Sequence, residues 1–300
     1  MTNISKGRYW DKPWSLVDGC TPCSPGCDHC WAAGMAHRFA REGEPGHTCG
    51  VLTDESGRFN GAVVPRPDRI SIPLKRKPTV WAVWNDWCHE AVPHEFRGDM
   101  MDTVMCAPQH TYLFLTKRPT VALDFWRWLE TKTTGDYREE LLKYIYFGLT
   151  VCNQQEADEK IPVFLQVPGK KFLSIEPLLS EISLRWLRPS RGWYDNKLKT
   201  TGFVDEYDGL RLIDAVILGG ETGPDARPMH PDWVRSVRGR CAEAGVPFFF
   251  KQWGKHRPGL KELFGNHYEC RLKQMPDRYE IMNAGRLLDG RTHDDLPWTD

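Results

Sequence analysis

The chain has 300 residues, of which 40% are hydrophobic and 12% aromatic, so it can bury a large core in one barrel or in two modest domains. Its 40 lysines and arginines balance 40 aspartates and glutamates, which excludes the global basicity of a non-specific nucleic-acid binder but not a local basic groove. No run approaches the about eighteen apolar residues of a membrane helix, and the polar, aromatic N-terminus does not resemble a signal peptide. We therefore expect a cytoplasmic protein with no membrane partner.

Short apolar, β-branched or aromatic runs alternate along the chain with segments of helical spacing, which predicts βαβ units and a parallel sheet. The predicted strands are 15–19, 79–84, 111–116, 144–151, 171–177, 212–220 and 246–253. The predicted helices are 31–42, 94–107, 120–132 and 230–245, the last with Pro231 at its start and Gly245 at its end. About seven strands in series favour an α/β fold with a full or partial (β/α) barrel. An open doubly wound sheet is the alternative.

Two segments interrupt this alternation and are predicted to be loop insertions over one end of the barrel. They are residues 43–78, rich in Gly, Pro and Arg, and residues 189–209. Residues 1–254 are therefore expected to form the barrel domain. Residues 255–300, polar and irregular, are expected to be an extension that packs on it.

Four of the ten cysteines, Cys20, Cys23, Cys27 and Cys30, directly follow the first predicted strand. In a reducing cytoplasm such a cluster indicates metal binding or catalysis rather than disulfides. A four-cysteine zinc site usually separates its two pairs by roughly a dozen residues or more, which this loop does not. An iron–sulfur cluster fits a short wrapping loop better. The other six are interpreted as small buried hydrophobic residues: Cys49, Cys88, Cys106, Cys152, Cys241 and Cys270.

Polar side chains stand at the C-terminal ends of the predicted strands, where barrel active sites are built. We predict catalytic roles for Lys117, Glu176 and Lys251. Asn85 and Asp86 follow the second strand, and Gly219, Gly220 and Glu221 follow the sixth. Glycines let a backbone approach a ligand closely and a carboxylate can hold an ammonium group, although a tight turn closing the strand explains the glycines equally well.

The spacing of Cys23, Cys27 and Cys30, C-x3-C-x2-C between a strand and a helix, resembles that of the radical S-adenosylmethionine (radical SAM) superfamily. Roughly residues 10–254 are also similar to a phage- and bacteria-encoded radical-SAM-like family of largely unassigned function. In the pattern of that family, G-C-T-x-x-S-x-G-C-x-x-C, the ligands are Cys20, Cys27 and Cys30. Further matches are LTKRP (115–119), SIEPLL (174–179), GGETGPDARPMHPDW (219–233) and FFFKQWG (248–254).

The resemblance implies a partial barrel of radical SAM type with a [4Fe–4S] cluster, and S-adenosylmethionine cleaved to a 5′-deoxyadenosyl radical that abstracts hydrogen from a substrate. Asn85, Asp86, Gly219, Gly220 and Glu221 would then bind S-adenosylmethionine. An external electron donor such as flavodoxin would be a partner. Kinship with phage relatives points to an isomerase, mutase or nucleobase-modifying enzyme in the host cytoplasm. Its substrate would be a modified nucleobase or nucleotide in phage DNA, for example an amino-acid-decorated thymine.

Two other functions stay open. In one, all four cysteines cap a cluster that only transfers electrons; in the other, they hold zinc in a nucleic-acid-binding module. For a nucleic-acid substrate, Lys117, Arg118 and the basic segment 66–78 are candidate phosphate contacts. Six tryptophans are candidates either for base stacking or for the core: Trp10, Trp14, Trp31, Trp84, Trp87 and Trp253.

Overall fold

A parallel sheet of seven strands forms the centre of the protein, with strand order β1-β4-β5-β6-β7-β10-β11. The computed structural model describes residues 3–40, 52–184, 194–195, 200–201, 208–223, 225–256 and 285–299. The seven strands are Lys12–Pro13 (β1), Val80–Val83 (β4), Thr111–Thr116 (β5), Ile145–Thr150 (β6), Lys170–Ile175 (β7), Ala215–Gly219 (β10) and Phe248–Gln252 (β11).

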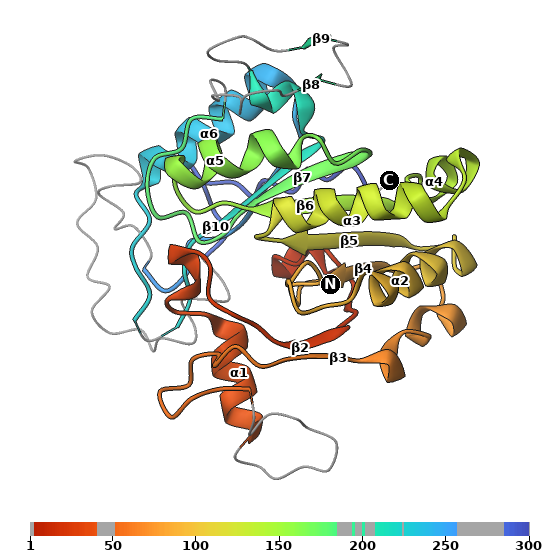
Figure 1. The fold of residues 1–300 in the computed structure, drawn as a ribbon. Coiled ribbons are helices and arrows are strands. Elements are labelled where there is room, and N and C mark those ends of the chain that lie inside the picture. Colours follow the sequence, from red (N-terminus) through yellow and green to blue (C-terminus); the bar gives the residue numbers. More distant parts are fainter. Residues whose placement is uncertain are drawn as a thin grey trace, which may run out of the picture.

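Helices cover the outer face of this sheet, which is curled into a half-barrel (Figure 1). The helices of this layer are His94–Cys106 (α2), Pro119–Lys132 (α3), Gly135–Leu141 (α4), Gln154–Phe164 (α5) and Pro231–Ala244 (α6), whereas Trp31–Ala40 (α1) lies apart from it. Helix α3 packs between α2 and α5. The α/β class and the parallel sheet are as the sequence predicts, and the barrel is partial.

The two faces of the sheet bury different side chains, because residues along each strand alternate in direction. In β10, Val216 and Leu218 join the core beneath the helices, whereas Ala215 and Ile217 point to the inner face. The inner face is filled by aromatic side chains from both ends of the chain together with the strands. These inner residues are Tyr9, Leu113, Tyr146, Phe172, Ala215, Ile217, Phe249, Leu296 and Trp298.

The predicted strand 15–19 exists over Val17–Gly19, but its place as the first strand of the central sheet was wrong, because that position is taken by β1. Val17–Gly19 (β2) instead pairs antiparallel with Val63–Pro65 (β3) in a separate ribbon. Gly19 has φ +85°, in the left-handed region that a regular strand does not use, and a side chain there would collide with the carbonyl of Ala62. Asp18 is held by Arg66 and Arg69 beside β3, which draws the segment away from the sheet.

The predicted helices were found, and α6 has Pro231 at its first position and Gly245 with φ +68° at its end, as predicted. Helices α4 and α5 were not predicted. Helix α4 is seven residues long, and α5 is polar and contains Pro162, so neither has a clear apolar period. Both begin at a side-chain cap, Thr134 for α4 and Asn153 for α5.

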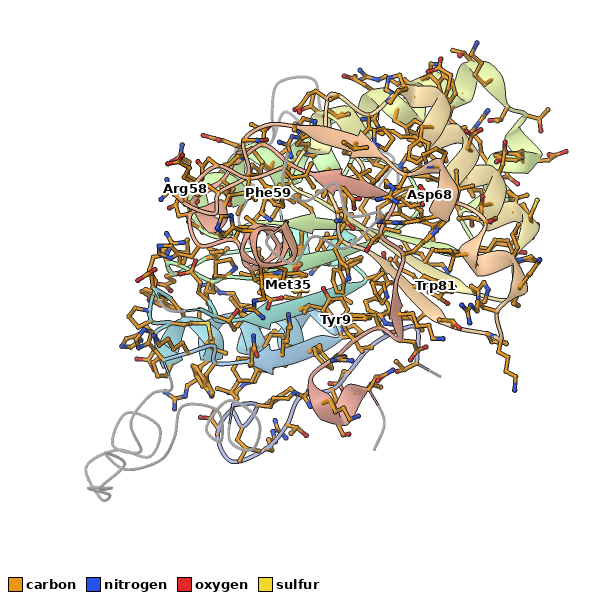
Figure 2. The ribbon with its side chains drawn as sticks, turned by 90° about the horizontal axis from the view of Figure 1, so that it is seen from below. Tyr9, Met35, Arg58, Phe59, Asp68 and Trp81 are labelled. Atoms are coloured by element: carbon orange, nitrogen blue, oxygen red, sulfur yellow. The ribbon has the colours of Figure 1, made fainter. Side chains whose placement is uncertain are left out.

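Part of each predicted insertion lies outside the described residues. Within 52–78, Thr53 bridges Phe59 in a small hairpin, which is followed by β3 and the 3-10 turns Pro67–Arg69 and Ile72–Lys75. Within 189–209, Tyr194–Asp195 (β8) pairs antiparallel with Thr200–Thr201 (β9). Figure 2 shows α1 end-on, with Met35 on it, near the hairpin that carries Arg58 and Phe59. In the described chain no helix is long and apolar enough to cross a membrane.

Candidate functional site

Polar residues collect at the carboxyl edge of the sheet, where all seven parallel strands end together. The segment 20–30, here the cysteine loop, lies across this edge. Its Gly26 touches the end of two strands: an added Cβ would meet Sγ of Cys152, after β6, at 2.5 Å and Cδ of Pro177, after β7, at 3.1 Å. The structure therefore brings the cysteines to the same edge as the predicted polar residues.

The cysteine loop contains a short 3-10 turn, Pro25–Cys27, capped by Ser24. The Ser24 hydroxyl accepts a hydrogen bond from N of Gly26 at 3.1 Å, and the Ser24 carbonyl accepts one from N of Cys27 at 2.8 Å. All four thiols are free; Cys23 is exposed, and Cys20, Cys27 and Cys30 are half-buried. A hydrogen bond from the Cys23 thiol, assisted by the charge of Lys117, lowers the pKa of Cys27 to about 5 against the opposing effect of burial. The Cys23 thiol and Lys117 thus favour the thiolate form of Cys27.

Arg118, at the start of α3, holds the first half of the loop. Its guanidinium is 7% exposed; Nη2 donates to the carbonyl of Thr21 at 2.7 Å, and Nη1 contacts Sγ of Cys20 at 3.9 Å. The same group forms ion pairs with Asp86 and, at 2.9 Å, with Glu90. Burial, together with the charge of Asp86, raises the pKa of Cys20 to about 11 despite the nearby Arg118. Asp86, predicted to bind a cofactor, therefore anchors Arg118.

Arg227, between β10 and α6, holds the second half of the loop. It donates from Nη2 to the carbonyl of Pro25 at 2.8 Å and from Nη1 to Asp28 at 3.3 Å. Its Nε and Nη2 also reach the two carboxylate oxygens of Glu221 at 2.9 and 2.7 Å. Nδ1 of His29, within the loop, lies 3.1 Å from Glu221. Burial raises the pKa of Glu221, but these hydrogen bonds outweigh it and lower the pKa below its ordinary value.

A fifth thiol, Cys152, lies beneath the cysteine loop. Its side chain is fully buried, and its Sγ is 3.8 Å from Oγ of Ser24. Burial is the main cause that raises its pKa, to about 12. Cys152 is buried as predicted, but the sequence does not reveal its place beside the loop, because the two are joined only by folding. Of the other single cysteines, Cys88 and Cys241 are buried as predicted, Cys106 is exposed against the prediction, and Cys49 and Cys270 lie outside the described residues.

Lys117 directly follows β5 and is half-buried at the carboxyl edge of the sheet. Burial lowers the pKa of Lys117, but its electrostatic interactions, with Cys27 first and Asp86 among the others, outweigh burial and raise the pKa above its ordinary value. Within the described residues no carboxylate forms an ion pair with Lys117. Lys117 is thus a half-buried cation at the strand end, close enough to Cys27 and Asp86 to interact with both electrostatically.

Glu176 and Lys251 form the second polar group of the edge. Nζ of Lys251, in β11, donates to Oε1 of Glu176 at 2.5 Å, and both side chains are largely buried. Gly219 gives room to this pair, since a Cβ there would stand 3.4 Å from the Glu176 carboxyl group. Gly220 passes so close to the carbonyl of Trp253 that a Cβ would lie 1.9 Å from its oxygen. The two glycines therefore serve close packing between β7, β10 and β11.

Asn85, after β4, presents a buried acceptor, Oδ1, with no hydrogen-bond partner among the described atoms. A buried amide oxygen without a donor is costly, so this position suits a ligand donor or a water molecule. Among the residues predicted to bind a cofactor, Asn85 thus has a buried side-chain oxygen that can still accept a hydrogen bond from a ligand.

The predicted aromatic and basic contacts divide into buried and exposed groups. Trp14, Trp87 and Trp253 belong to the core, Trp10 and Trp84 pack edge to face at 4.8 Å, and Trp31 is 58% exposed. In the basic segment, Arg66 and Arg69 bind Asp18, whereas Lys75, Arg76 and Lys77 are exposed. The first two are therefore structural, and the last three remain available to a polyanion.

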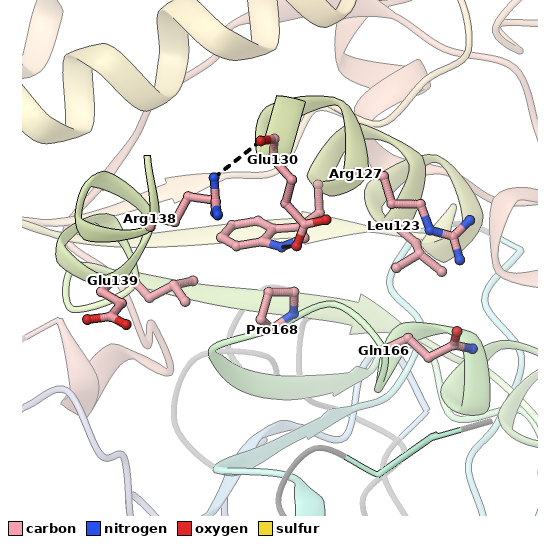
Figure 3. A pocket seen from close by; sticks show the side chains of 10 residues that line it. Leu123, Arg127, Glu130, Arg138, Glu139, Gln166 and Pro168 are labelled. Carbon is pink, nitrogen blue, oxygen red and sulfur yellow. Dashed lines mark hydrogen bonds between the residues drawn. The ribbon is translucent and has the colours of Figure 1, made fainter. Parts of the chain in front are cut away.

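A surface pocket of about 420 Å³ lies elsewhere, between α3, α4 and the loop before β7 (Figure 3). Its lining includes Trp126, Arg127, Arg138 and Pro168, and it shares no residue with the carboxyl edge. Across the described ranges, no group of three or more His, Cys, Asp and Glu side chains is arranged to hold a metal ion.

The fold and this edge define a class: an α/β half-barrel protein that carries a cysteine loop across the carboxyl ends of its strands. Residues 4–297 match the model of DUF5131, described as a protein of unknown function, and the chain belongs to this family. Comparison with curated proteins gave no match, and neither did comparison with solved structures.

Proposed function

We propose that this protein is a radical SAM enzyme. One observation carries the proposal: four free thiols on one short loop lie across the carboxyl edge of a curled parallel sheet. Active sites of β/α barrels are built at this edge. The cysteine spacing within the loop resembles that of radical SAM enzymes, so position and motif support the same chemistry.

The residues present fit an iron–sulfur cluster by the chemistry of their donors. Thiolates are the usual cluster ligands, and the lowered pKa of Cys27 favours its thiolate form. We assign Cys27 and Cys30 as ligands, with Cys20 or Cys23 as the third. Lys117 and Arg118 place positive charge beside the thiols and would offset the negative charge of a thiolate-bound cluster. The unpartnered Oδ1 of Asn85 suits the ammonium group of S-adenosylmethionine.

Cys27, Cys30 and either Cys20 or Cys23 would hold a [4Fe–4S] cluster, which would supply an electron from an external donor such as flavodoxin for the cleavage of S-adenosylmethionine to methionine and a 5′-deoxyadenosyl radical that would abstract hydrogen from the substrate. The chain itself would orient the reactants and exclude water. The Lys251 ammonium group, held by Glu176, is placed to donate a hydrogen bond or a proton to a substrate oxygen.

For the substrate, we propose a modified nucleobase or nucleotide of phage DNA, such as an amino-acid-decorated thymine, and an isomerase or mutase reaction. The support is the resemblance to phage-encoded proteins and the exposed cations Lys75, Arg76 and Lys77, which suit phosphate. Transfer of deuterium from a labelled nucleotide into 5′-deoxyadenosine, followed by mass spectrometry, tests this assignment. Unlabelled 5′-deoxyadenosine in the presence of every such nucleotide contradicts it.

The cluster chemistry is tested by anaerobic reconstitution with iron and sulfide, followed by reduction and addition of S-adenosylmethionine. We expect 5′-deoxyadenosine, detected by chromatography, from wild type and from the control Cys106→Ala, whose thiol is exposed at the end of α2. We expect none from Cys27→Ala. Whichever of Cys20→Ala and Cys23→Ala retains activity identifies the thiol that is not a ligand.

The proposal fails if a four-iron cluster forms in wild type and no 5′-deoxyadenosine appears. That result leaves an electron-transfer protein. It fails equally if the chain binds one zinc ion and no iron, and then a structural or nucleic-acid-binding role remains.

A further inference from the structure

Arg227 joins two segments that are far apart in the chain. It is separated by 202 residues from Pro25 and by 199 from Asp28, and its guanidinium reaches both. The backbone N of Arg227 also donates to Oε2 of Glu221 at 2.8 Å, which closes the turn after β10. One side chain therefore fixes both the turn after β10 and the cysteine loop.

The carboxylate of Glu221 is fully engaged by Arg227 and His29. Its side chain is 4% exposed, and both carboxylate oxygens accept from Arg227 while His29 lies against Oε2. A buried carboxylate is stable only where charge-assisted hydrogen bonds of this kind satisfy it. A ligand ammonium group would have to displace Arg227 to reach it.

We propose that Arg227 and Glu221, with His29, form a loop anchor: a set of positioning residues that fixes the second half of the cysteine loop over the strand ends. The anchor sets the positions of Cys27 and Cys30 relative to β10. Glu221 acts through Arg227 and His29, not by touching S-adenosylmethionine. The anchor is the counterpart of Arg118, which holds Cys20 and Thr21.

The anchor itself follows from the contacts, and its consequence for a cluster rests on the proposed function. When two residues act in one network, replacing either one already disrupts it. The double variant of Arg227 and Glu221 should therefore disturb the cysteine loop no more than either single variant does. This non-additivity separates an anchor from two independent ligand contacts.

The first experiment uses the metal-free protein and hydrogen exchange of the amides of Gly26–Cys30. We expect Arg227→Gln and Glu221→Gln each to speed exchange roughly tenfold or more, because each breaks charge-assisted bonds to the loop. The double variant should match the singles. The control is Arg238→Gln on α6, which breaks an ion pair with Asp289 and should leave the loop unchanged.

The second experiment uses reconstituted protein and measures iron per chain, the electron paramagnetic resonance signal of the reduced cluster, and KM for S-adenosylmethionine. We expect Arg227→Gln and Glu221→Gln both to lower the iron content and to alter the electron paramagnetic resonance signal. Arg227→Lys should lose less iron than Arg227→Gln, because lysine keeps the positive charge but cannot make the bidentate contact.

The anchor is overturned if loop exchange and iron content stay at wild-type values in both variants. A rise in KM in Glu221→Gln alone would then assign Glu221 to the ligand. If wild type never binds a cluster, the proposed function fails, while the exchange experiment still decides whether the anchor exists.

Discussion

The protonation state of Cys27 is decided by its neighbours. The Cys23 thiol donates a hydrogen bond to it and Lys117 adds positive charge, which lowers the pKa from 9.0 to about 5. We expect alkylation of Cys27 by iodoacetamide in metal-free protein to fall to half its plateau near pH 5, as followed by peptide mass spectrometry. A depressed pKa stabilises the fold fully above the unfolded value of 9.0, and the contribution is lost as pH falls through about 5.

The matched variant is Cys23→Ala, which removes the donated hydrogen bond and leaves Lys117 in place. The midpoint of Cys27 alkylation should move to higher pH in this variant. An unchanged midpoint would show that the hydrogen bond is not the cause.

Periodicity was enough to place the individual polar residues at the sheet edge. Lys117 and Glu176 directly follow apolar strands and Lys251 lies near the end of β11, so their position at the carboxyl edge comes from strand direction alone. The contacts within the site could not be predicted from the sequence. A contact such as that of Arg227 with Pro25 joins segments 202 residues apart, so it leaves no local sequence pattern. Arg118 appeared in the sequence only as a phosphate contact, whereas the structure turns it toward Cys20 and Asp86.

The cysteine loop as an element depends on the absence of a side chain at Gly26. In Gly26→Ala the new Cβ would lie 2.5 Å from Sγ of Cys152, so the loop or Cys152 must move. We expect a loss of about 1–3 kcal/mol in the free energy of unfolding, measured with urea. The control is Gly34→Ala on exposed α1, where a Cβ meets nothing within 4 Å and alanine favours the helix.

Cys152→Ala added to Gly26→Ala removes the colliding sulfur and should recover part of the lost stability. A double variant less stable than the sum of the two single changes would contradict this account of the contact.

The strands were predictable as elements because most are buried apolar runs, which is what a parallel sheet covered on both faces requires. The exception is instructive: β1 is two exposed residues, Lys12 and Pro13, while the more apolar 15–19 forms a ribbon outside the sheet. Tertiary pairing with Val80–Val83 decides β1, since the backbone of Asp11 and Trp14 bonds to that strand. Neither composition nor period encodes this choice.

The whole half-barrel is closed on its inner face by the end of the chain. Nε1 of Trp298 donates to the carbonyl of Tyr9 at 2.9 Å, and its ring packs edge to face on Tyr146 at 4.9 Å and on Phe172 at 5.6 Å. The two ends of the chain and the middle of the sheet thus form one core. Disrupting this core should therefore lower the free energy of unfolding of the entire molecule.

We expect Trp298→Ala to lower the free energy of unfolding by about 3–5 kcal/mol, because it removes a buried aromatic ring and leaves the Tyr9 carbonyl without its donor. Urea unfolding followed by circular dichroism measures this. The control Trp31→Ala removes a ring that is 58% exposed and should change the free energy by less than about 0.5 kcal/mol. Equal losses in the free energy of unfolding for the two substitutions would contradict the conclusion that residues 285–299 close the inner face of the sheet.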